Sequence, residues 1–395
     1  MTVDTVVTFN AGSSTVKIGL FALDGAHPRR IARGVVDFRH DPLTFRMEVG
    51  EDDIDVTLAA RPGDALGVIL PEVFSILARH CDFGRIAAVG HRIVHGGDRF
   101  GGPARLDAEA IAAIEALTAL APLHQPQGLR LIRAVAEVLP EMPQAASFDT
   151  AFHRTNDALV RRFAIPRDLY DRGIKRYGFH GLSYKSIAGE LARRAPEAAA
   201  GKVVVAHLGS GASLCGMEGG VSRDTSMGFS TLDGIPMATR CGALDPGVLL
   251  HLLGGEGRSL KEVEEMLYHR SGLIGVSGIS ADSRVLLESE TPEARLAIDL
   301  FVLRIAGEVA RLAATLGGLD ALVFTAGIGE NQPAVRAGVC ARLAWLGLDL
   351  DPEANARNAG TITTPESRIR AFVIPTDEEQ VIADETVAVL NAARR

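Results

Sequence analysis

The feature that most constrains this fold is an apolar strand that runs into a glycine and serine turn and leaves it through a second strand. This pattern occurs at Thr5–Leu20 and again at Val203–Cys215. Two copies of one such unit indicate an internal duplication. A third glycine-rich stretch, Gly327–Asn331, follows the apolar segment Ala321–Thr325. We expect it to be a loop at the carboxyl end of a strand, where ligands bind in α/β sheets.

The first turn carries residues that suit a phosphate group. Because side chains alternate along a strand, Asn10 reaches the turn on the polar face, and Lys17 lies opposite the apolar face of the second strand. Gly12, Ser13 and Ser14 offer a backbone that accepts positive φ and several N–H and hydroxyl donors. An ordinary β-hairpin has the same pattern, so the recurrence is what favours a phosphate site.

The length of 395 residues predicts two domains, and 47% hydrophobic residues are enough to fill two cores. Strand-rich segments come first in each half and alternate with helical segments afterwards, which indicates an α/β fold. We expect an N-terminal domain over residues 1–150 and a C-terminal domain over residues 151–380. A final helix, about residues 381–395, is expected to pack on the first domain.

The charge and the cysteines narrow the class of protein. A net charge of -8 argues against nucleic acid as a partner, because phosphate backbones need a basic surface. The four cysteines are too scattered for a zinc site or a disulfide framework, which favours a reducing, cytoplasmic location. No leader-like segment or membrane-length apolar run occurs, so we expect no membrane partner.

Several common catalytic motifs are absent from the sequence. It has no phosphate-binding Gly-x4-Gly-Lys-Ser/Thr, no Gly-x-Gly-x-x-Gly after a strand, no His-Glu-x-x-His and no Gly-x-Ser-x-Gly. These absences argue against a P-loop NTPase, a dehydrogenase, a zincin and an α/β-hydrolase.

Charged residues at loop positions remain as candidates for a site. The cationic side chains that could surround an anion are Arg92, Arg240, Arg284, His180 and His207. The side chains that could offer oxygen ligands to Mg2+ are Asn10, Asp149 and Glu378. Taken singly, such residues more often have structural roles. His91 and His95 fit buried structural histidines, Asp282 with Arg284 fits a surface ion pair, and Thr376–Glu379 fits a helix cap.

Taken together and in order, eight segments spread over the whole chain resemble the acetate kinase (acetokinase) family. They are Asn10-Ala-Gly-Ser-Ser14 with Lys17, His91-Arg-Ile-Val-His-Gly-Gly97, Ala121-Pro-Leu-His124, Phe148-Asp-Thr-Ala-Phe-His153, Tyr177-Gly-Phe-His-Gly181, His207-Leu-Gly-Ser-Gly211, Phe324-Thr-Ala-Gly-Ile-Gly-Glu-Asn331 and Thr376-Asp-Glu-Glu379. The resemblance implies two duplicated ribonuclease-H-like domains of the actin-like ATPase type, with an interdomain cleft. It also implies a homodimer.

The activity that this resemblance implies is reversible phosphoryl transfer from ATP to acetate, giving acetyl phosphate and ADP. Mg2+ is the expected metal, with Mn2+ as an alternative. Propionate kinase is the nearest competing hypothesis. An actin-like ATPase and a sugar kinase are competing hypotheses from other classes, because the same fold and nucleotide segments serve them.

The resemblance also implies a role for particular residues. It gives Asn10 and Glu378 to the metal, Lys17 to a nucleotide phosphate, and Arg92 to the carboxylate or acyl phosphate. It gives Asp149 an acid or base role and makes His180 and Arg240 stabilise the transition state. The implied nucleotide-binding residues are His207, Leu208, Gly209, Ser210 and Gly211, then Asp282, Ser283 and Arg284, and then Gly327, Ile328, Gly329, Glu330 and Asn331.

The chemistry of a carboxylate acceptor modifies one of these roles. A carboxylate is already a nucleophile at neutral pH, so the site must chiefly bring two anions together and neutralise charge. We therefore expect Asp149 to orient an arginine or the water on the metal, more than to take up a proton.

The implied acyl pocket is lined by Val94, Leu123 and Phe179, with Thr231 where the family usually has a proline. Other departures from the family pattern are Ser210 and Gln125, each in place of an asparagine, and Tyr184 in place of a histidine. The change at Thr231 bears on chain-length preference, since it alters the wall beside the acyl group.

Overall fold

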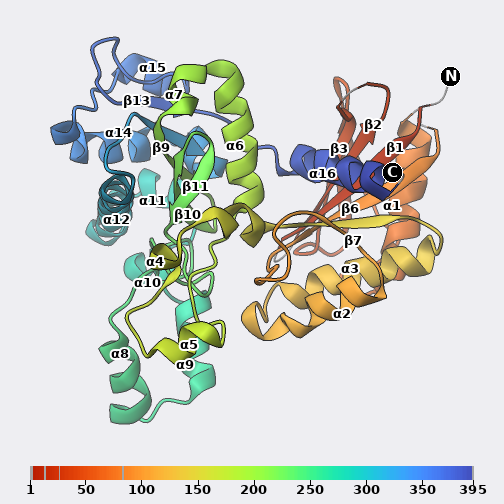
Figure 1. Cartoon of the computed structure of the whole chain (residues 1–395), viewed down its shortest axis with the longest axis horizontal. Coiled ribbons are helices and arrows are strands. Elements are labelled where there is room, and N and C mark those ends of the chain that lie inside the picture. The colour runs from red at the N-terminus through yellow and green to blue at the C-terminus, as the bar shows by residue number, and fades with distance from the viewer. Residues whose placement is uncertain (1–2, 13–14, 26, 82–83, 394–395) are drawn as a thin grey trace. The chain divides into compact units, whose positions relative to one another are not determined.

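The computed structural model describes residues 3–12, 15–25, 27–81 and 84–393, and it divides the chain into two compact units (Figure 1). The first unit comprises Met1–Phe152 together with Asp377–Arg395, so the end of the chain returns to it. The second unit comprises His153–Thr376.

The first unit is a mixed sheet with helices on it. Its strands are β1 (Thr5–Ala11), β2 (Thr15–Ala22), β3 (Arg29–Asp37), β4 (Thr44–Val49), β5 (Asp52–Thr57), β6 (Ile86–Ile93), β7 (Ala104–Arg105) and β8 (Gln144–Phe148). Its helices are α1 (Leu66–His80), α2 (Ala108–Ala116), η1 (Thr118–Leu120), α3 (Gln125–Val138) and α16 (Glu378–Ala393), and the 3-10 helix η2 (Asp149–Thr155) begins directly after β8. The strand order is β5-β4-β3-β2-β1-β6-β8-β7.

Helices cover both faces of this sheet because its central strands are apolar on both sides. Phe9 and Val89 belong to a core cluster with residues of α1 and α3. Gly90, the next residue of β6, faces the other way, where a Cβ atom would lie 2.7 Å from a methyl carbon of Ile382 and 2.2 Å from the hydroxyl of Thr386 on α16. Glycine therefore lets α16 lie close to β6.

The second unit has its own sheet and a larger set of helices. Its strands are β9 (Lys202–Leu208), β10 (Ala212–Glu218), β11 (Val221–Thr225), β12 (Ala321–Thr325) and β13 (Arg370–Val373). Its helices are α4 (Ala158–Arg161), α5 (Arg167–Asp171), α6 (Gly181–Arg194), α7 (Pro196–Ala200), α8 (Pro246–Leu250), the π-helix η3 (His251–Gly255), α9 (Leu260–His269), α10 (Gly272–Ser277), α11 (Ser283–Glu288), α12 (Pro292–Leu316), α13 (Ala326–Asn331), α14 (Pro333–Arg342), η4 (Ala344–Leu346) and α15 (Pro352–Ala356).

The two sheets share one topology, which confirms the duplication that the repeated turns predict. The order β3-β2-β1-β6-β8 in the first unit corresponds to β11-β10-β9-β12-β13 in the second. In both runs the first two pairings are antiparallel and the last two are parallel. The predicted α/β class is therefore confirmed, with one sheet in each unit.

The prediction that Gly327–Asn331 is a loop is wrong, because this segment forms the short helix α13. Glycine has low helix propensity, so the sequence favours a loop there. The helix is held by the Glu330 carboxylate, whose Oε1 accepts hydrogen bonds from the N–H of Ala326 at 2.7 Å and of Thr376 at 3.3 Å. Ala326 itself has φ +63, a left-handed conformation that turns the chain from strand to helix.

Other boundaries also differ from the sequence expectation. The segment Arg223–Asp245 is rich in glycine, threonine, methionine and charged residues, which predicts an irregular loop, but Arg223 lies within β11 and the irregular part begins only after Thr225. Ser13 and Ser14, central to the first predicted turn, lie outside the described residues. Next to them, the N–H of Gly12 donates to the carbonyl of Thr15 at 2.8 Å, which closes the β1–β2 hairpin.

All four cysteines are free thiols, in agreement with their scattered positions. Among the described residues, no helix combines the length and the apolar character needed to cross a membrane.

Three buried histidines predict acid sensitivity of the fold. Burial lowers the pKa of His91, His95 and His153 to about 4. In an unfolded chain the histidine pKa is about 6.5, so between these values the unfolded chain binds protons that the folded chain does not. The free energy of unfolding must therefore fall as the pH falls through this range, by up to about 1.4 kcal/mol per pH unit for each histidine.

We expect the urea midpoint to be lower at pH 5 than at pH 7 with an unchanged m-value. A His91→Gln variant should show a weaker dependence on pH, because it removes one of the three groups. A midpoint that is flat over this range would show that the folded protein accommodates the charged rings.

Candidate functional site

The first unit gathers polar side chains where its parallel strands end. Asn10 lies near the end of β1, Arg92 near the end of β6, and Asp149 directly follows β8. Because β1, β6 and β8 run parallel, their carboxyl ends meet at one edge of the sheet. Glu378 and Glu379 join them from the first turn of α16. We call these five residues the carboxylate cluster.

Arg92 is the centre of the carboxylate cluster. Its Nε and Nη2 donate to the two carboxylate oxygens of Asp149 at 3.0 and 2.7 Å, and its Nη1 donates to Asn10 Oδ1 at 3.0 Å. Nη1 also lies 3.9 Å from Glu378 Oε2. Burial opposes the positive charge, but Asp149 and Glu378 outweigh it and raise the pKa of Arg92 above its ordinary value.

The geometry leaves Arg92 able to hold an anion. A guanidinium has five N–H donors, and the three bonds just described use three of them. One N–H on Nη1 and one on Nη2 remain for a carboxylate or a phosphate. Asp149 is 1% exposed and grips the other edge of the guanidinium, so it fixes the plane in which those donors lie.

The opposite side of the carboxylate cluster offers oxygens to a cation. Asn10 Nδ2 donates to Glu378 Oε2 and to Glu379 Oε1, each at 2.8 Å, so the amide holds the two carboxylates together. Three carboxyl groups surround one guanidinium, and carboxylate oxygens are the donors that Mg2+ prefers. No group of three or more His, Cys, Asp or Glu side chains in the described part of the chain is arranged to bind a metal by itself. Asn10, Glu378 and Glu379 nevertheless lie together and carry oxygen atoms of the kind that such a cation accepts.

The other predicted site residues of the first unit are Lys17, Val94 and Leu123, which differ in exposure. Lys17 on β2 pairs in register with Asn10 on β1, and its side chain is exposed. Val94 directly follows β6 and is buried, whereas Leu123 is 39% exposed. His91 and His95, by contrast, are structural. His91 Nε2 lies 2.7 Å from Gln144 Oε1, and the N–H of Gly97 donates to His95 Nδ1 at 3.0 Å.

The second unit gathers a pair of stacked histidines. The rings of His180 and His207 are 4.3 Å apart at an interplanar angle of 17°. His207 Nδ1 lies 2.8 Å from Ser183 Oγ, and His180 Nδ1 lies 2.8 Å from Ser213 Oγ. His180 precedes α6 with φ +57, a left-handed conformation that is uncommon for a residue with a Cβ atom and is found most often at functional sites.

Arg240 converges with His180 on the glycine turn after β9. A Cβ atom on Gly211 would lie 3.4 Å from Arg240 Nη2 and 3.5 Å from His180 Nε2, so both groups point to the same place. Arg240 Nη1 donates to the carbonyl of Thr231 at 3.1 Å. Burial lowers the pKa of Arg240 below its ordinary value. Within the described residues Arg240 has no carboxylate as hydrogen-bond or ion-pair partner, so an anion would be its natural counter-ion.

The predicted nucleotide segments lie close to one another in the second unit. His207 and Thr325 pair in register at the ends of β9 and β12, and a Cβ atom on Gly209 would lie 3.7 Å from that of Ala326, the first residue of α13. Gln332, which follows α13, donates to the hydroxyl of Ser283 at the start of α11 at 2.6 Å.

The members of these three segments differ in exposure. Leu208, Ser283, Ile328 and Gly329 are buried, whereas Ser210, Arg284, Gly327 and Asn331 are exposed. Asp282 caps α11 and pairs with the exposed Arg284, as in the surface-pair interpretation. Phe179 is buried, and Thr231 is 9% exposed.

Sequence reasoning missed several residues that form hydrogen bonds to the predicted site residues. Glu379 binds Asn10 beside Glu378, and Ser213 binds His180. Arg336 is fully buried, and its five N–H groups all donate to neutral oxygens, two of them the carbonyls of Gly329 and Glu330 in α13. An arginine inside the amphipathic helix α14 gives no sequence signal that distinguishes it from a surface residue.

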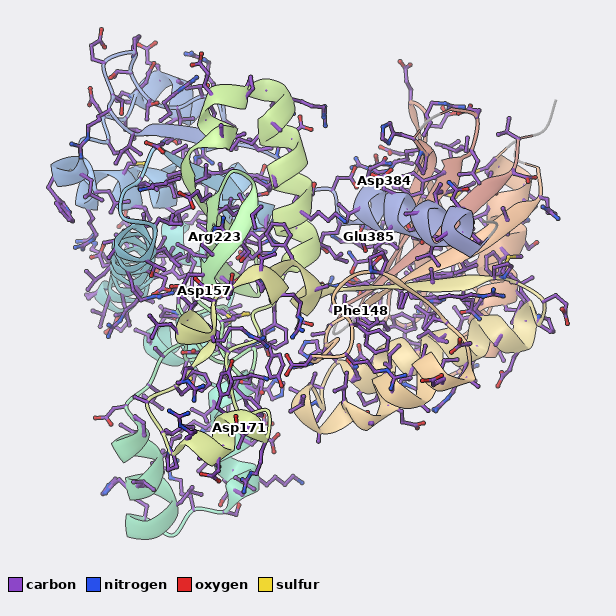
Figure 2. All side chains as sticks on the ribbon, in the orientation of Figure 1. Phe148, Asp157, Asp171, Arg223, Asp384 and Glu385 are labelled. Atoms are coloured by element: carbon purple, nitrogen blue, oxygen red, sulfur yellow. The ribbon has the colours of Figure 1, made fainter. Side chains whose placement is uncertain are left out.

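Aromatic packing in the core supports the carboxylate cluster. Phe148, the last residue of β8 and labelled in Figure 2, stacks on Phe100 with ring centroids 4.4 Å apart. Because Asp149 follows directly, this packing fixes the point from which Asp149 reaches Arg92.

The fold and these two groups define an α/β protein with a duplicated five-strand unit and two arginines, Arg92 near the end of β6 and Arg240 beside the glycine turn after β9. The sequence matches the acetokinase family over residues 5–384. The chain belongs to this family.

Individual relatives agree with that assignment. An acetate kinase of Rhodopseudomonas palustris is 48% identical over 393 residues, which cover 96% of this chain and 97% of the relative. Among solved structures, a propionate kinase from Francisella tularensis has a TM-score of 0.90 at 34% identity and covers 98% of this chain and 100% of that one. An acetate kinase from Porphyromonas gingivalis has a TM-score of 0.86 at 33% identity with the same coverage.

Proposed function

We propose that this chain catalyses reversible phosphoryl transfer between ATP and acetate, with acetyl phosphate and ADP as the products. The observation that supports the proposal most strongly is the 48% identity to an acetate kinase along nearly the whole of both chains. The two groups of residues described above supply a chemical rationale.

Arg92 is proposed to bind the acceptor carboxylate through its two remaining N–H groups. Asp149 would act by fixing the guanidinium, since it occupies the edge formed by Nε and Nη2. A carboxylate acceptor carries its own nucleophilic lone pair, so no side chain has to remove a proton from it. In this role Asp149 does not act as a general base. We expect Asp149→Asn, which replaces the carboxylate by an amide, to impair the positioning of Arg92.

Asn10 and Glu378 are proposed to hold Mg2+, with Mn2+ as the alternative, and Glu379 supports them through Asn10. When bound, the metal would neutralise charge on the phosphates of the nucleotide. Lys17 is proposed to contact a nucleotide phosphate from β2, where it pairs in register with Asn10.

His180 and Arg240 are proposed to stabilise the phosphoryl group during transfer. Their Nε2 and Nη2 atoms point to one place beside Gly211, where negative charge on the equatorial oxygens would meet two donors. The segments 207–211, 282–284 and 327–331 would bind the rest of the nucleotide. We further propose a cytoplasmic homodimer as the working form, on the family resemblance alone.

A hydroxamate assay with ATP and Mg2+ tests this function. Acetate, propionate, butyrate and glycerol are supplied in parallel, and both hydroxamate and ADP are measured. We expect hydroxamate with acetate and no ADP above background with glycerol. ADP formation that is independent of any acid would favour an actin-like ATPase, and ADP formation with glycerol would favour a sugar kinase.

The chain-length preference gives a further prediction. Propionate should be used within about tenfold of acetate in kcat/KM, because one methylene in an apolar pocket changes binding only modestly. Thr231 is proposed to line this pocket with Val94, Leu123 and Phe179. Thr231→Pro should sharpen the preference for acetate by stiffening the wall, while keeping the carbonyl that accepts from Arg240.

Measuring kcat/KM for both acids in both proteins tests this prediction. If propionate is already a poor substrate and proline changes nothing, residue 231 does not border the acyl group.

A further inference from the structure

A buried pair of hydroxyl groups stands behind His180. Ser213 lies on β10 and Tyr184 lies on α6, one helical turn after His180, and both residues are 0% exposed. Tyr184 Oη is 2.5 Å from Ser213 Oγ, and Ser213 Oγ is 2.8 Å from His180 Nδ1. The three polar groups therefore form a continuous hydrogen-bonded chain from the interior to the imidazole.

We propose that Tyr184 and Ser213 are positioning residues that hold His180 with Nε2 toward Gly211. The proposal rests on the function proposed above only in that His180 is taken to stabilise the phosphoryl group during transfer. The hydrogen-bonded chain itself is independent of that use.

The orientation follows from the geometry of the ring. Nδ1 is engaged by Ser213, and the ring plane is fixed by stacking on His207 at 4.3 Å. Nε2 then points toward Gly211, where Arg240 Nη2 also points. A ring held by one nitrogen and one face cannot rotate without breaking the hydrogen bond to Ser213.

The direction of the hydrogen bonds links the chain to the charge of His180. When the ring is neutral with its proton on Nε2, Ser213 can donate to Nδ1 and Tyr184 can donate to Ser213. When the ring is charged, Nδ1–H must donate to Ser213 Oγ, and the Ser213 hydrogen then needs another acceptor. Tyr184 Oη can donate to Ser213 in the first case and accept from it in the second, so it supports the Ser213–His180 hydrogen bond in either charge state.

Other side chains pack beside this chain. Arg240 approaches the same place as His180 Nε2, and His207 stacks on the ring from β9. The ring of His153 meets the ring of Tyr184 edge-on at 5.6 Å, and burial lowers the pKa of His153 to about 4. These contacts add packing to the hydrogen bonds that hold the two rings in place.

The test compares Tyr184→Phe with a matched control, Tyr177→Phe. Tyr177 is also buried, and its hydroxyl donates to the carbonyl of Gly173 at 2.9 Å. Both variants lose one hydroxyl group and keep the aromatic ring. In Tyr184→Phe we expect kcat for acyl phosphate formation to fall about tenfold, the size of one well-made hydrogen bond, with KM for ATP and acetate changed less than twofold. Tyr177→Phe should retain the kcat of the natural protein.

A double-variant cycle separates a relay from two independent supports. Because Tyr184 acts through Ser213, the double variant Ser213→Ala with Tyr184→Phe should be no slower than Ser213→Ala alone. Additive losses would overturn the relay. Equal losses in Tyr184→Phe and Tyr177→Phe would show that general loosening of the fold is responsible.

A spectroscopic measurement does not depend on turnover. In protein labelled with 15N-histidine, with the His180 signals identified by their absence in His180→Gln, the Nδ1 chemical shift of His180 should change in Tyr184→Phe, because the hydrogen bond at Nδ1 loses its support, and stay in place in Tyr177→Phe. An unchanged Nδ1 shift in Tyr184→Phe would overturn the proposal even in an active enzyme. A changed shift in a protein that makes no acyl phosphate would support the relay and refute only the proposed function.

Discussion

Arg92→Ala is expected to lower kcat/KM for acetate by about two to three orders of magnitude, the usual effect of removing a donor that contacts transferring charge. The residue is proposed to bind the carboxylate with the two N–H groups that its bonds to Asp149 and Asn10 leave over. The measurement is steady-state kinetics with circular dichroism to verify folding. Arg133→Ala is the matched control, since Arg133 belongs to the same unit and forms an exposed pair with Glu115.

Arg92→Lys refines this test. Lysine keeps the charge but loses the planar fork that meets Asp149 with two bonds and an anion with the opposite edge. We expect Arg92→Lys to remain well below the natural protein. Full activity in Arg92→Lys would mean that only charge is needed, and near-normal activity in Arg92→Ala would remove Arg92 from the site.

Arg240→Ala is expected to have a rate effect of the same order, about 10²-fold to 10³-fold, with a smaller effect on stability. Arg240 is half-buried, and its described hydrogen bond is to a neutral carbonyl, that of Thr231. Truncation therefore removes a cation that pairs with no carboxylate among the described residues, so the fold should tolerate it.

Kinetics and thermal unfolding of Arg240→Ala can be compared with Arg258→Ala, which alters an exposed pair with Glu256. A large loss of stability together with a small loss of rate would mean that Arg240 serves the fold. The reverse result is the expected one.

Much of the fold is predictable from local sequence patterns. The repeated strand and turn indicate the duplication. Residues that favour caps also mark helix ends: Asp107 caps α2, Ser259 and Glu262 form a capping box at the start of α9, and Gly317 ends α12 in the left-handed conformation. Each of these signals acts within a few residues, which is why sequence reasoning captures them.

The parts that sequence reasoning missed depend on contacts between distant segments. Helix α13 forms in a glycine-rich segment because Glu330 accepts bonds from its N-terminal turn and Arg336 donates to its carbonyls. The link from Tyr184 through Ser213 to His180 joins a helix to a strand. No local pattern encodes such pairings, since each partner alone is an ordinary polar residue.

The bond between Arg92 and Asp149 shows the same limit at the proposed site. Sequence reasoning selects both residues and expects Asp149 to orient an arginine or a metal-bound water. The structure identifies Arg92 as the partner, through two bonds at 3.0 and 2.7 Å. Arg92 and Asp149 are 57 residues apart in the sequence, and only the fold brings β6 and the end of β8 together.

The central claim is that a carboxylate accepts the phosphoryl group of ATP, and that Arg92 and Arg240 are each needed for this transfer. The most direct test follows the fate of the label from ATP labelled at the γ-phosphate, with Mg2+ and acetate, in the natural protein and in both alanine variants. The account predicts that labelled acetyl phosphate appears in a one-to-one ratio with ADP, depends on acetate, and is nearly lost in both variants. Labelled inorganic phosphate that forms at the same rate with and without acetate would contradict it.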